Sequence, residues 1–386
     1  MTQTGNTPPI RIAGAGPSGL AAAITLARAD RMVEVHEAKP DVGARFIGDL
    51  QIIENASAEE TVPDFLRRIG IETNFYVRPS TEARFYDHRG RSRAIRSSVP
   101  YGYFIRRGPI EGSLDRGLLA QALALGVDVR FGSRLAPDEA AIVATGPATP
   151  DGLAREITFV SSEAERVEVY FDHRVSPGGY SYLFILDGVG TFGCAIVSDF
   201  RNIDGYFERA LAAAEAIRPF DHGRELRTGY SYMNFHLKEH ASKNGSRYVG
   251  EAGGFQDYLF GLGIRYAITT GHLAARSILE NRSYDELWMA EIGARQKTGL
   301  VNRFLYESGG NAGLSLFIRQ AGGAKDFRRY LAGWHRYSWW KRPLLPLVER
   351  LWKQKGRCQH KPGEHWCRAR DTEMKTPPLG PAEERS

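Results

Sequence analysis

Hydrophobic and polar positions near the start of the chain predict a strand, a tight turn, a helix and a second strand in close succession. Residues 10–13 form a short apolar run, and residues 20–27 place apolar side chains at helical spacing. Residues 33–37 then alternate between apolar and polar and end at an acid, Glu37. This order is typical of a dinucleotide-binding βαβ unit.

Three glycines in the predicted turn, Gly14, Gly16 and Gly19, have the spacing G-x-G-x-x-G. The first allows the tight turn, the second lets the backbone approach a pyrophosphate, and the third permits close packing of helix on strand. N–H groups of the first helical turn, which contains Ser18, attract phosphate. Glu37 can accept hydrogen bonds from a ribose diol and would repel a 2′-phosphate, which favours FAD or NAD over NADP. The alternative is a glycine-rich turn without a ligand.

The following segments continue as mixed helices and strands. Residues 75–95 alternate around a glycine turn and predict a hairpin, and residues 101–107 predict a strand. Residues 118–125 predict a helix and residues 127–131 another strand. Residues 140–146 are small and branched and end in Thr145-Gly146, a composition that suits the interior of a parallel sheet.

Between residues 157 and 196 the pattern changes to several strands separated by turns, which predicts a mostly antiparallel unit. Residues 206–217 predict a helix. Residues 247–249 form a short strand that leads into a second glycine cluster at 250–254, and residues 266–279 are again helical. The chain therefore returns to the nucleotide-binding unit after the antiparallel segment.

Together these elements predict an α/β fold. We expect a Rossmann-like FAD-binding domain, an interleaved and mostly antiparallel α+β substrate domain, and a helical C-terminal region. The expected bounds are 1–74, 101–156 and 245–285 for the first, 75–100 and 157–244 for the second, and 286–386 for the third, whose proline-rich end at 376–386 we expect to be disordered.

Composition is that of a globular protein. The 386 residues are 42% hydrophobic, and no run of about eighteen apolar residues could span a bilayer. Only Cys194, Cys358 and Cys367 are present, which excludes a disulfide framework and fits a reducing compartment. The polar start of the chain lacks the features of a signal peptide. We therefore expect a cytoplasmic protein.

Positive charge is concentrated at the C-terminus. From Lys325 onward there are 15 Lys and Arg against 7 Asp and Glu, whereas the whole chain carries +6. Five tryptophans lie among these cations, at Trp334, Trp339, Trp340, Trp352 and Trp366. This combination suits peripheral contact with a membrane surface of anionic lipid. The alternative is a helical flap over the substrate cavity, and nucleic acid is disfavoured because no binding module accompanies the charge.

Four potential metal ligands lie close together in the same region, namely Cys358, His360, His365 and Cys367. Each pair has one intervening residue, which is narrower than the usual spacing of structural zinc ligands. Surface residues or a local turn are therefore the favoured interpretation, and we assign no metal.

The first glycine motif, the segment 144–146 and the segment 250–254 together resemble the FAD-binding fold of the flavoprotein hydroxylase (p-hydroxybenzoate hydroxylase-like) superfamily, over residues 8–280. Glu251 stands where that superfamily usually has an aspartate near the ribityl chain. Arg107 resembles its FAD-contacting arginine, with Arg106 as the alternative. Arg45 is a loop cation that could contact the cofactor or could equally be solvated. The expected FAD site comprises Gly14, Gly16, Ser18, Gly19, Glu37, Arg45, Arg107, Thr145, Gly146, Glu251, Gly253 and Gly263.

Within that superfamily, residues 177–185 and 193–195 resemble the geranylgeranyl reductase signature Y-x-W-x-F-P with a later G-x-G. Tyr182 replaces the tryptophan, Ile185 the proline and Ala195 the last glycine. The cysteine-containing glycine stretch of many members is replaced by residues 46–49. The resemblance implies that Tyr180, Tyr182 and Phe184 form the wall of a lipid-binding cavity. The alternative is that these three residues belong to an ordinary aromatic strand.

The resemblance implies that reduced FAD reduces a carbon–carbon double bond of an isoprenoid or related lipid. A flavin-dependent monooxygenase acting on an aromatic or lipid substrate is the first alternative, although the W-x-W-x-I-P segment of halogenases is absent. The second alternative is a flavin electron-transfer or lipid-binding protein that catalyses no reaction. The chain has no second complete G-x-G-x-x-G, so the electron donor stays open between NAD(P)H and a ferredoxin-like carrier. No catalytic residue is assigned.

Overall fold

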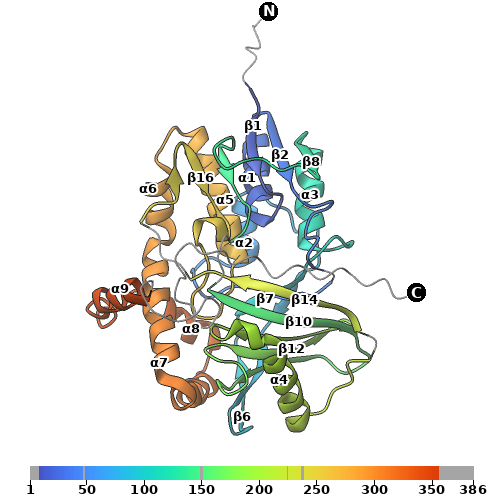
Figure 1. Cartoon of the computed structure of the whole chain (residues 1–386), viewed down its shortest axis with the longest axis vertical. Coiled ribbons are helices and arrows are strands. Elements are labelled where there is room, and N and C mark those ends of the chain that lie inside the picture. Colours follow the sequence, from blue (N-terminus) through green and yellow to red (C-terminus); the bar gives the residue numbers. More distant parts are fainter. Residues whose placement is uncertain (1–7, 47, 148–150, 224, 236–238, 356–386) are drawn as a thin grey trace, which may run out of the picture.

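The computed structural model describes residues 8–46, 48–147, 151–223, 225–235 and 239–355. Its three parts are distinguishable in Figure 1: a sheet with helices at the top, a larger sheet below it, and a group of C-terminal helices along one side. The C-terminal helices extend beside both sheets. This arrangement places the junction between the two sheets at the centre of the molecule.

The upper sheet has six strands in the order β15-β16-β9-β1-β2-β8. All neighbouring strands are parallel except β15 and β16. Helix α1 packs against α3 and α5, and this arrangement confirms the predicted Rossmann-like unit. The bounds are β15 Ser242–Lys243, β16 Ser246–Tyr248, β9 Ile142–Val143, β1 Ile10–Ala13, β2 Val33–Glu37, β8 Asp128–Phe131, α1 Pro17–Ala27, α2 Val62–Arg68, α3 Leu114–Ala124 and α5 Ile264–Leu279.

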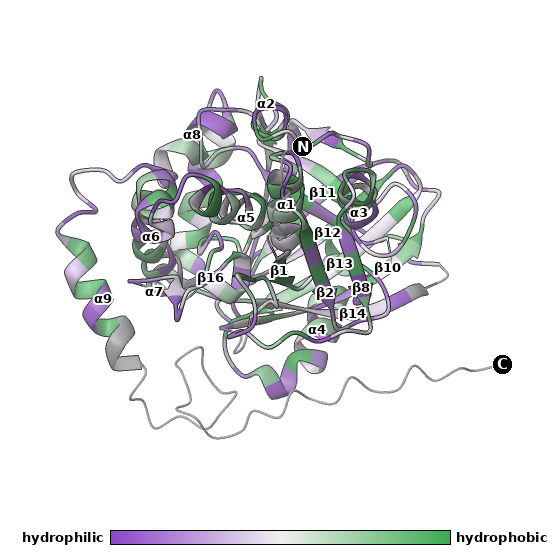
Figure 2. Cartoon of the chain, turned by 90° about the horizontal axis from the view of Figure 1, so that it is seen from above, coloured by the Kyte–Doolittle hydropathy of each residue, from purple (hydrophilic) through white to green (hydrophobic). Residues whose placement is uncertain are grey.

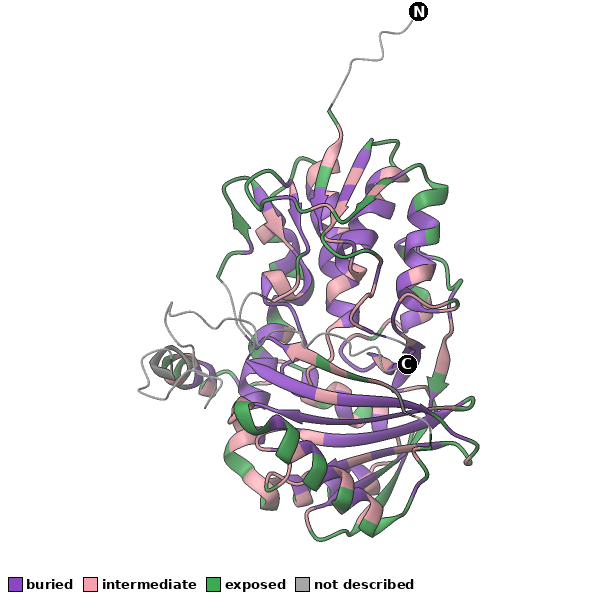
Figure 3. Ribbon diagram, turned by 45° about the vertical axis from the view of Figure 1, so that its right-hand side comes forward, coloured by how far each residue is buried: buried purple, intermediate pink, exposed green. Residues whose placement is uncertain are grey.

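The lower sheet has seven strands in the order β14-β10-β13-β12-β11-β5-β6, and only β11 and β5 are parallel neighbours. The prediction of a mostly antiparallel unit is therefore confirmed. Helix α4 covers one face, and Figure 3 shows its exposed outer side over mainly buried strands. The bounds are β5 Glu82–Asp87, β6 Ser92–Arg96, β10 Gly152–Val160, β11 Arg166–Phe171, β12 Tyr180–Leu186, β13 Val189–Ile196, α4 Ile203–Ile217 and β14 Glu225–Met233.

The sheet boundaries differ from those expected from the sequence. The boundary expected between residues 156 and 157 falls inside β10, all of which pairs with β13 and β14. The lower sheet therefore begins earlier in the sequence than expected, at Gly152. A small third sheet, β3-β7-β4, also joins segments that the sequence assigned to different domains, with bounds β3 Leu50–Glu54, β4 Arg78–Ser80 and β7 Gly102–Arg106.

The described C-terminal region is helical, as predicted. Helix α7 bends at Gly310, whose φ is +51°. Helix α9 packs against α7 and lies at the edge of the molecule in Figure 2. Among the described residues, no helix combines the length and the apolar character needed to cross a bilayer. The elements are α6 Tyr284–Trp288, a π-helical turn Met289–Gly293, α7 Ala294–Gly323, α8 Phe327–His335 and α9 Leu344–Lys355.

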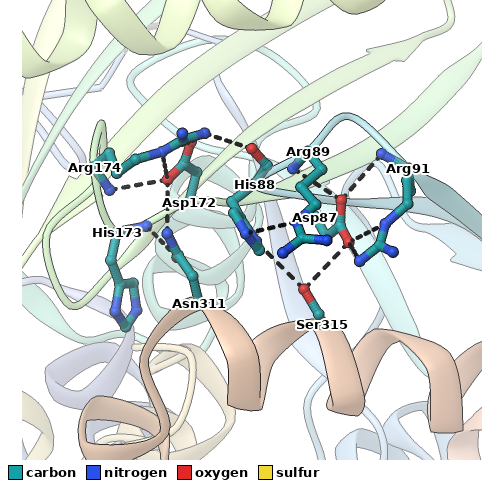
Figure 4. Close-up of polar contacts among 9 residues, drawn as sticks. All are labelled: Asp87, His88, Arg89, Arg91, Asp172, His173, Arg174, Asn311 and Ser315. Atoms are coloured by element: carbon teal, nitrogen blue, oxygen red, sulfur yellow. Dashed lines mark hydrogen bonds and ion pairs between the residues drawn. The ribbon is translucent and has the colours of Figure 1, made fainter.

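Polar contacts join α7 to the lower sheet (Figure 4). Asp87, at the end of β5, accepts hydrogen bonds from Arg91 and from the Ser315 hydroxyl of α7, the latter at 3.2 Å. The Asn311 amide of α7 donates to Asp172 at 3.1 Å and accepts from the His173 backbone N–H at 2.8 Å. These contacts fix α7 against the ends of β5 and β11.

Glycines bring α1 into backbone contact with its neighbours. A Cβ added at Gly19 would lie 2.0 Å from the Gly14 carbonyl oxygen. A Cβ at Gly271 in α5 would lie 2.0 Å from the Ser18 carbonyl oxygen. Such distances are far below a van der Waals contact, so only glycine allows these two helices and the turn to pack this closely. The packing role predicted for the third glycine of the motif is confirmed.

Replacement of Gly271 by alanine should therefore destabilise the fold. The new methyl group would meet rigid backbone, so we expect the free energy of unfolding to fall by an amount at the upper end of roughly 1–3 kcal/mol. Gly205→Ala is the matched control, because its Cβ would meet only the flexible end of Arg209 at 3.4 Å on the exposed side of α4. That variant should gain about 0.5–1 kcal/mol from helix propensity. Urea unfolding measures both, and equal stabilities would contradict the packing argument.

Candidate functional site

One continuous cavity of about 990 Å³ runs between the two sheets. Its lining includes the glycine turn after β1, the end of β2, the segments after β9 and β16, and the inner face of the lower sheet. Ligand pockets commonly span about 300–1,000 Å³, so this cavity is large enough for an extended ligand. Thirteen of the fifteen residues expected at the cofactor or substrate site line it: Gly14, Gly16, Ser18, Glu37, Arg45, Arg107, Thr145, Gly146, Tyr180, Tyr182, Phe184, Glu251 and Gly263.

The glycine turn presents open backbone to this cavity. Gly14 has a φ of +103°, and a Cβ there would lie 2.4 Å from the Ala144 carbonyl oxygen. At Gly16, by contrast, a Cβ would meet no atom of the described residues within 4 Å beyond its chain neighbours. Gly16 also caps the N-terminus of α1. The turn therefore has room for an anionic group beside the helix start, where N–H groups and the helix dipole favour negative charge.

Glu37 closes the other side of the turn. Its Oε2 accepts a hydrogen bond from the Ala15 backbone N–H at 2.8 Å, and its Oε1 accepts one from the Lys39 N–H at 2.9 Å. A carboxylate has about four lone-pair positions, so two remain for a ligand. The acid at the end of β2 is thus fixed in place and faces the cavity.

Two expected cofactor glycines do not line the cavity. Gly19 packs on Gly14 as described above. A Cβ at Gly253 would lie 2.4 Å from the Phe255 ring and 2.5 Å from the Tyr248 carbonyl oxygen. Both glycines therefore allow close packing behind the cavity wall and do not form its surface.

Charged side chains lie along the middle of the cavity. Nη2 of Arg45 is 3.9 Å from Oε2 of Glu251. Burial raises the pKa of Glu251, and the charges of Arg45 and Arg107 oppose that rise. Arg107 is buried and makes two hydrogen bonds to Asp115, at 2.9 and 3.0 Å. The alternative, Arg106, lies over the Tyr76 ring at 5.1 Å and, unlike Arg107, is not part of the cavity wall.

The substrate side of the cavity is aromatic. Tyr180, Tyr182 and Phe184 project from β12 with successive ring centroids 5.9 and 4.9 Å apart. The Tyr180 hydroxyl donates to the Phe260 carbonyl at 2.6 Å, which connects this row to the loop before α5. Further aromatic rings complete the wall, namely Phe85, Phe104, Phe171, Phe260 and Phe327.

The sequence did not indicate three polar residues near the lower sheet, namely Asp49, Glu156 and Ser231. Glu156 and Ser231 line the cavity. Asp49 is buried, and the charge of Glu156 is close enough to raise its pKa. The Gln51 amide donates to Asp49 at 3.0 Å and accepts from Arg107 at 3.0 Å. The available signal was the alternation in β10, where Glu156 shares a face with Ala154 and Thr158 opposite the large apolar residues.

Helix α8 adds a part of the C-terminal region to the site. Phe327, Leu331 and His335 line the cavity, and His335 Nδ1 is 3.9 Å from Asp257 Oδ1. Burial raises the pKa of Asp257. This arrangement agrees with the helical-flap interpretation. Trp339 is nevertheless 82% exposed, and the side chains of Trp352 and Trp366 lie outside the described part of the chain, as do Cys358, His360, His365, Cys367 and the segment 376–386.

Comparison with known proteins identifies the fold. Residues 12–47 match the description of an NAD(P)-binding Rossmann-like domain. A geranylgeranyl bacteriochlorophyll reductase-like protein from Thermoplasma acidophilum has a similar structure, with a TM-score of 0.68 and 16% identity over 90% of this chain and 98% of that one. No curated protein sequence matches.

Two other similar structures belong to enzymes that use flavin. A flavin-dependent brominase has a TM-score of 0.60 at 14% identity, over 89% of this chain and 99% of that one. A probable FAD-dependent monooxygenase from Pseudomonas aeruginosa has a TM-score of 0.56 at 16% identity, over 82% and 98%. At these identities the likeness concerns the fold alone, and it confirms the predicted α/β architecture with a Rossmann-like domain.

Asp49 should make stability depend on pH. Burial, and then the charge of Glu156, raise its pKa from 3.8 to about 7. The folded chain therefore binds this proton more tightly than the unfolded chain, so the free energy of unfolding should fall as the pH rises from about 4 to about 7. Asp49→Asn cannot ionise and should flatten this dependence.

Urea unfolding of the flavin-free protein at several pH values measures the Asp49 effect. Asp128→Asn, which removes an exposed carboxylate at the start of β8, is the control and should keep the wild-type slope. A wild-type slope in Asp49→Asn would show that another group dominates the titration.

Proposed function

We propose that this protein is an FAD-dependent oxidoreductase that reduces carbon–carbon double bonds of an isoprenoid or related lipid. The observation that carries the proposal is the continuity of the cavity, which joins the dinucleotide-type turn at Gly14 and Gly16 to the aromatic wall at Tyr180 and Tyr182. A cofactor and an apolar substrate would thus share one space. Such sharing is what direct hydride transfer between them requires.

The residues present fit FAD. The open turn at Gly16 suits a pyrophosphate, Glu37 retains acceptor positions for a ribose diol, and Arg45 and Arg107 supply positive charge along the path. FAD, when bound, would supply hydride chemistry at its flavin ring. Glu251 lies in the cavity opposite Arg45, at the position where the superfamily resemblance implies a ribityl contact.

The opposite end fits an apolar substrate. Tyr180, Tyr182 and Phe184 are largely buried, and their rings offer large contact areas to a prenyl chain. Water would be excluded by the same aromatic wall and by Phe327 and Leu331 of α8. The similar structure from Thermoplasma, named as geranylgeranyl reductase-like, supports this substrate class.

Oxygen activation is the second candidate, because the brominase and the monooxygenase share the fold over most of their length. In that case the bound substrate would be hydroxylated or halogenated. The two functions differ in what oxidises the reduced flavin, which is a prenyl substrate in one and molecular oxygen in the other. The electron donor, NAD(P)H or a ferredoxin-like carrier, is common to both.

Gly16→Ala should weaken FAD binding without unfolding the protein. Its Cβ meets no described atom within 4 Å and its φ of −75° suits alanine, but it would occupy the space of a closely approaching pyrophosphate. We expect FAD affinity to fall by about tenfold or more, which equals about 1.4 kcal/mol. The measurement is FAD titration of the flavin-free protein, with Gly205→Ala as the control. Unchanged affinity would place the cofactor elsewhere.

Anaerobic reoxidation tests the reaction itself. Photoreduced holoprotein mixed with a geranylgeranyl compound should regain the absorbance of oxidised flavin, and mass spectrometry should show a product heavier by two hydrogens per reduced bond. If the prenyl compound leaves the flavin reduced, and if admitting oxygen to the same protein with a phenolic or lipid substrate gives a product heavier by one oxygen atom, the result would favour the monooxygenase. Slow reoxidation of the flavin with every substrate and with oxygen would favour an electron-transfer or lipid-binding protein that catalyses no reaction.

A further inference from the structure

A buried carboxylate interrupts the aromatic wall of the cavity. Glu156, on β10, is 7% exposed and forms part of the lining. Its Oε1 accepts a hydrogen bond from the Tyr182 hydroxyl, and its Oε2 accepts one from the Ser231 hydroxyl at 2.7 Å. Among the described residues, no Lys, Arg or His nitrogen lies within 4.0 Å of the Glu156 carboxylate, and Arg227 interacts with it only at longer range. A negative charge with two neutral donors is an unusual component of an apolar surface, because burial of an unpaired charge is unfavourable.

The surrounding strands are shaped to hold this group. A Cβ at Gly193 of β13 would lie 2.3 Å from Cζ and 2.4 Å from the hydroxyl oxygen of Tyr182. Glycine therefore leaves the space in which the Tyr182 ring lies across β13 and reaches Glu156. Burial, and then the charge of Glu156, raise the pKa of the Tyr182 hydroxyl well above its ordinary value. Tyr182 accordingly remains protonated and acts as a donor to Glu156.

Two charged groups lie near Glu156, one acid and one cation. Asp49 is a second buried acid that interacts with it electrostatically. Arg227 is the nearby cation in the same electrostatic cluster, and its Nη1 is buried without a partner among the described residues. Arg227 is not part of the cavity lining, however. A ligand in the cavity would thus meet Glu156 and Ser231, and would not meet the guanidinium.

We propose that Glu156 is the acceptor for a hydroxyl or amino group on the substrate. The two protein donors leave about two of the four lone-pair positions of the carboxylate for a ligand. A substrate hydrogen-bond donor completes the set, whereas a diphosphate or carboxylate at this point meets the negative charge of Glu156 in a poorly solvated site. The proposal rests on the proposed function for the apolar part of the ligand, and it adds that the polar group is a donor.

Binding of three prenyl probes to the oxidised holoprotein tests this assignment. The probes are geranylgeraniol, its methyl ether and geranylgeranyl diphosphate, and the readout is the change in the visible spectrum of the bound flavin together with calorimetric affinity. The alcohol should bind about tenfold or more tightly than the ether, because a hydrogen bond to a charged group is stronger than one between neutral groups. The diphosphate should bind most weakly.

Glu156→Gln should bring the alcohol-to-ether affinity ratio close to one and improve diphosphate binding. Tyr180→Phe is the matched control: it removes a hydroxyl that donates to the Phe260 carbonyl, so it should change the affinities for alcohol and ether by the same factor. Ser231→Ala provides a second variant that retains the charge and should lower the ratio less than Glu156→Gln does.

The outcomes separate this proposal from the proposed function. Equal affinities of the wild-type protein for alcohol and ether, or tightest binding of the diphosphate, would overturn the role of Glu156 while the isoprenoid site stands, whether or not the variants fold. If the flavin-loaded wild-type protein binds none of the three probes, the isoprenoid substrate is wrong and the role of Glu156 falls with it.

Discussion

Backbone contact between α1 and its neighbours is the constraint on which the cavity depends. The Gly14 turn lies against the carbonyl of Ala144 after β9, and the Ser18 carbonyl lies against Gly271 in α5. These segments are far apart in the sequence, and contact at this distance allows no side chain between them. The contacts fix the relative positions of the turn, the end of β9 and the start of α5, which together form one end of the cavity.

Small residues have a second role in the lower sheet. A Cβ at Gly179 would lie 1.8 Å from the Ala195 carbonyl oxygen, and Gly193 leaves the space for the Tyr182 ring. These contacts give physical content to a partial motif: the first glycine of the G-x-G is required by the ring above it. Ala195 replaces the second glycine at a position that lines the cavity.

The sequence predicts those parts of the site whose residues lie close together along the chain, and it does not predict the parts that distant segments form together. Gly14, Gly16 and Glu37 lie in one βαβ unit, so spacing alone indicated their arrangement. Glu156, Tyr182 and Ser231 meet only because β10 pairs with β13 and β14, and β13 with β12, in particular registers. No spacing along the chain encodes these registers. The choice between Arg106 and Arg107 has the same cause, since Arg106 ends β7, Arg107 follows it, and sequence alone does not say which of two successive side chains faces the cavity.

The C-terminal region shows why composition is a weak guide to the role of aromatic and basic residues. Lys341 is fully buried, its ammonium donates to the Trp334 carbonyl near the end of α8, and burial lowers its pKa to about 8. It also lies 5.4 and 5.1 Å from the Trp334 and Trp340 rings. Part of the pattern that suits a membrane surface thus stabilises the end of the helix that covers the cavity. Trp339, in contrast, is exposed beside these contacts. Neighbouring residues of one basic, aromatic segment therefore perform different roles, and the way each side chain packs against α7 and α8 determines which one.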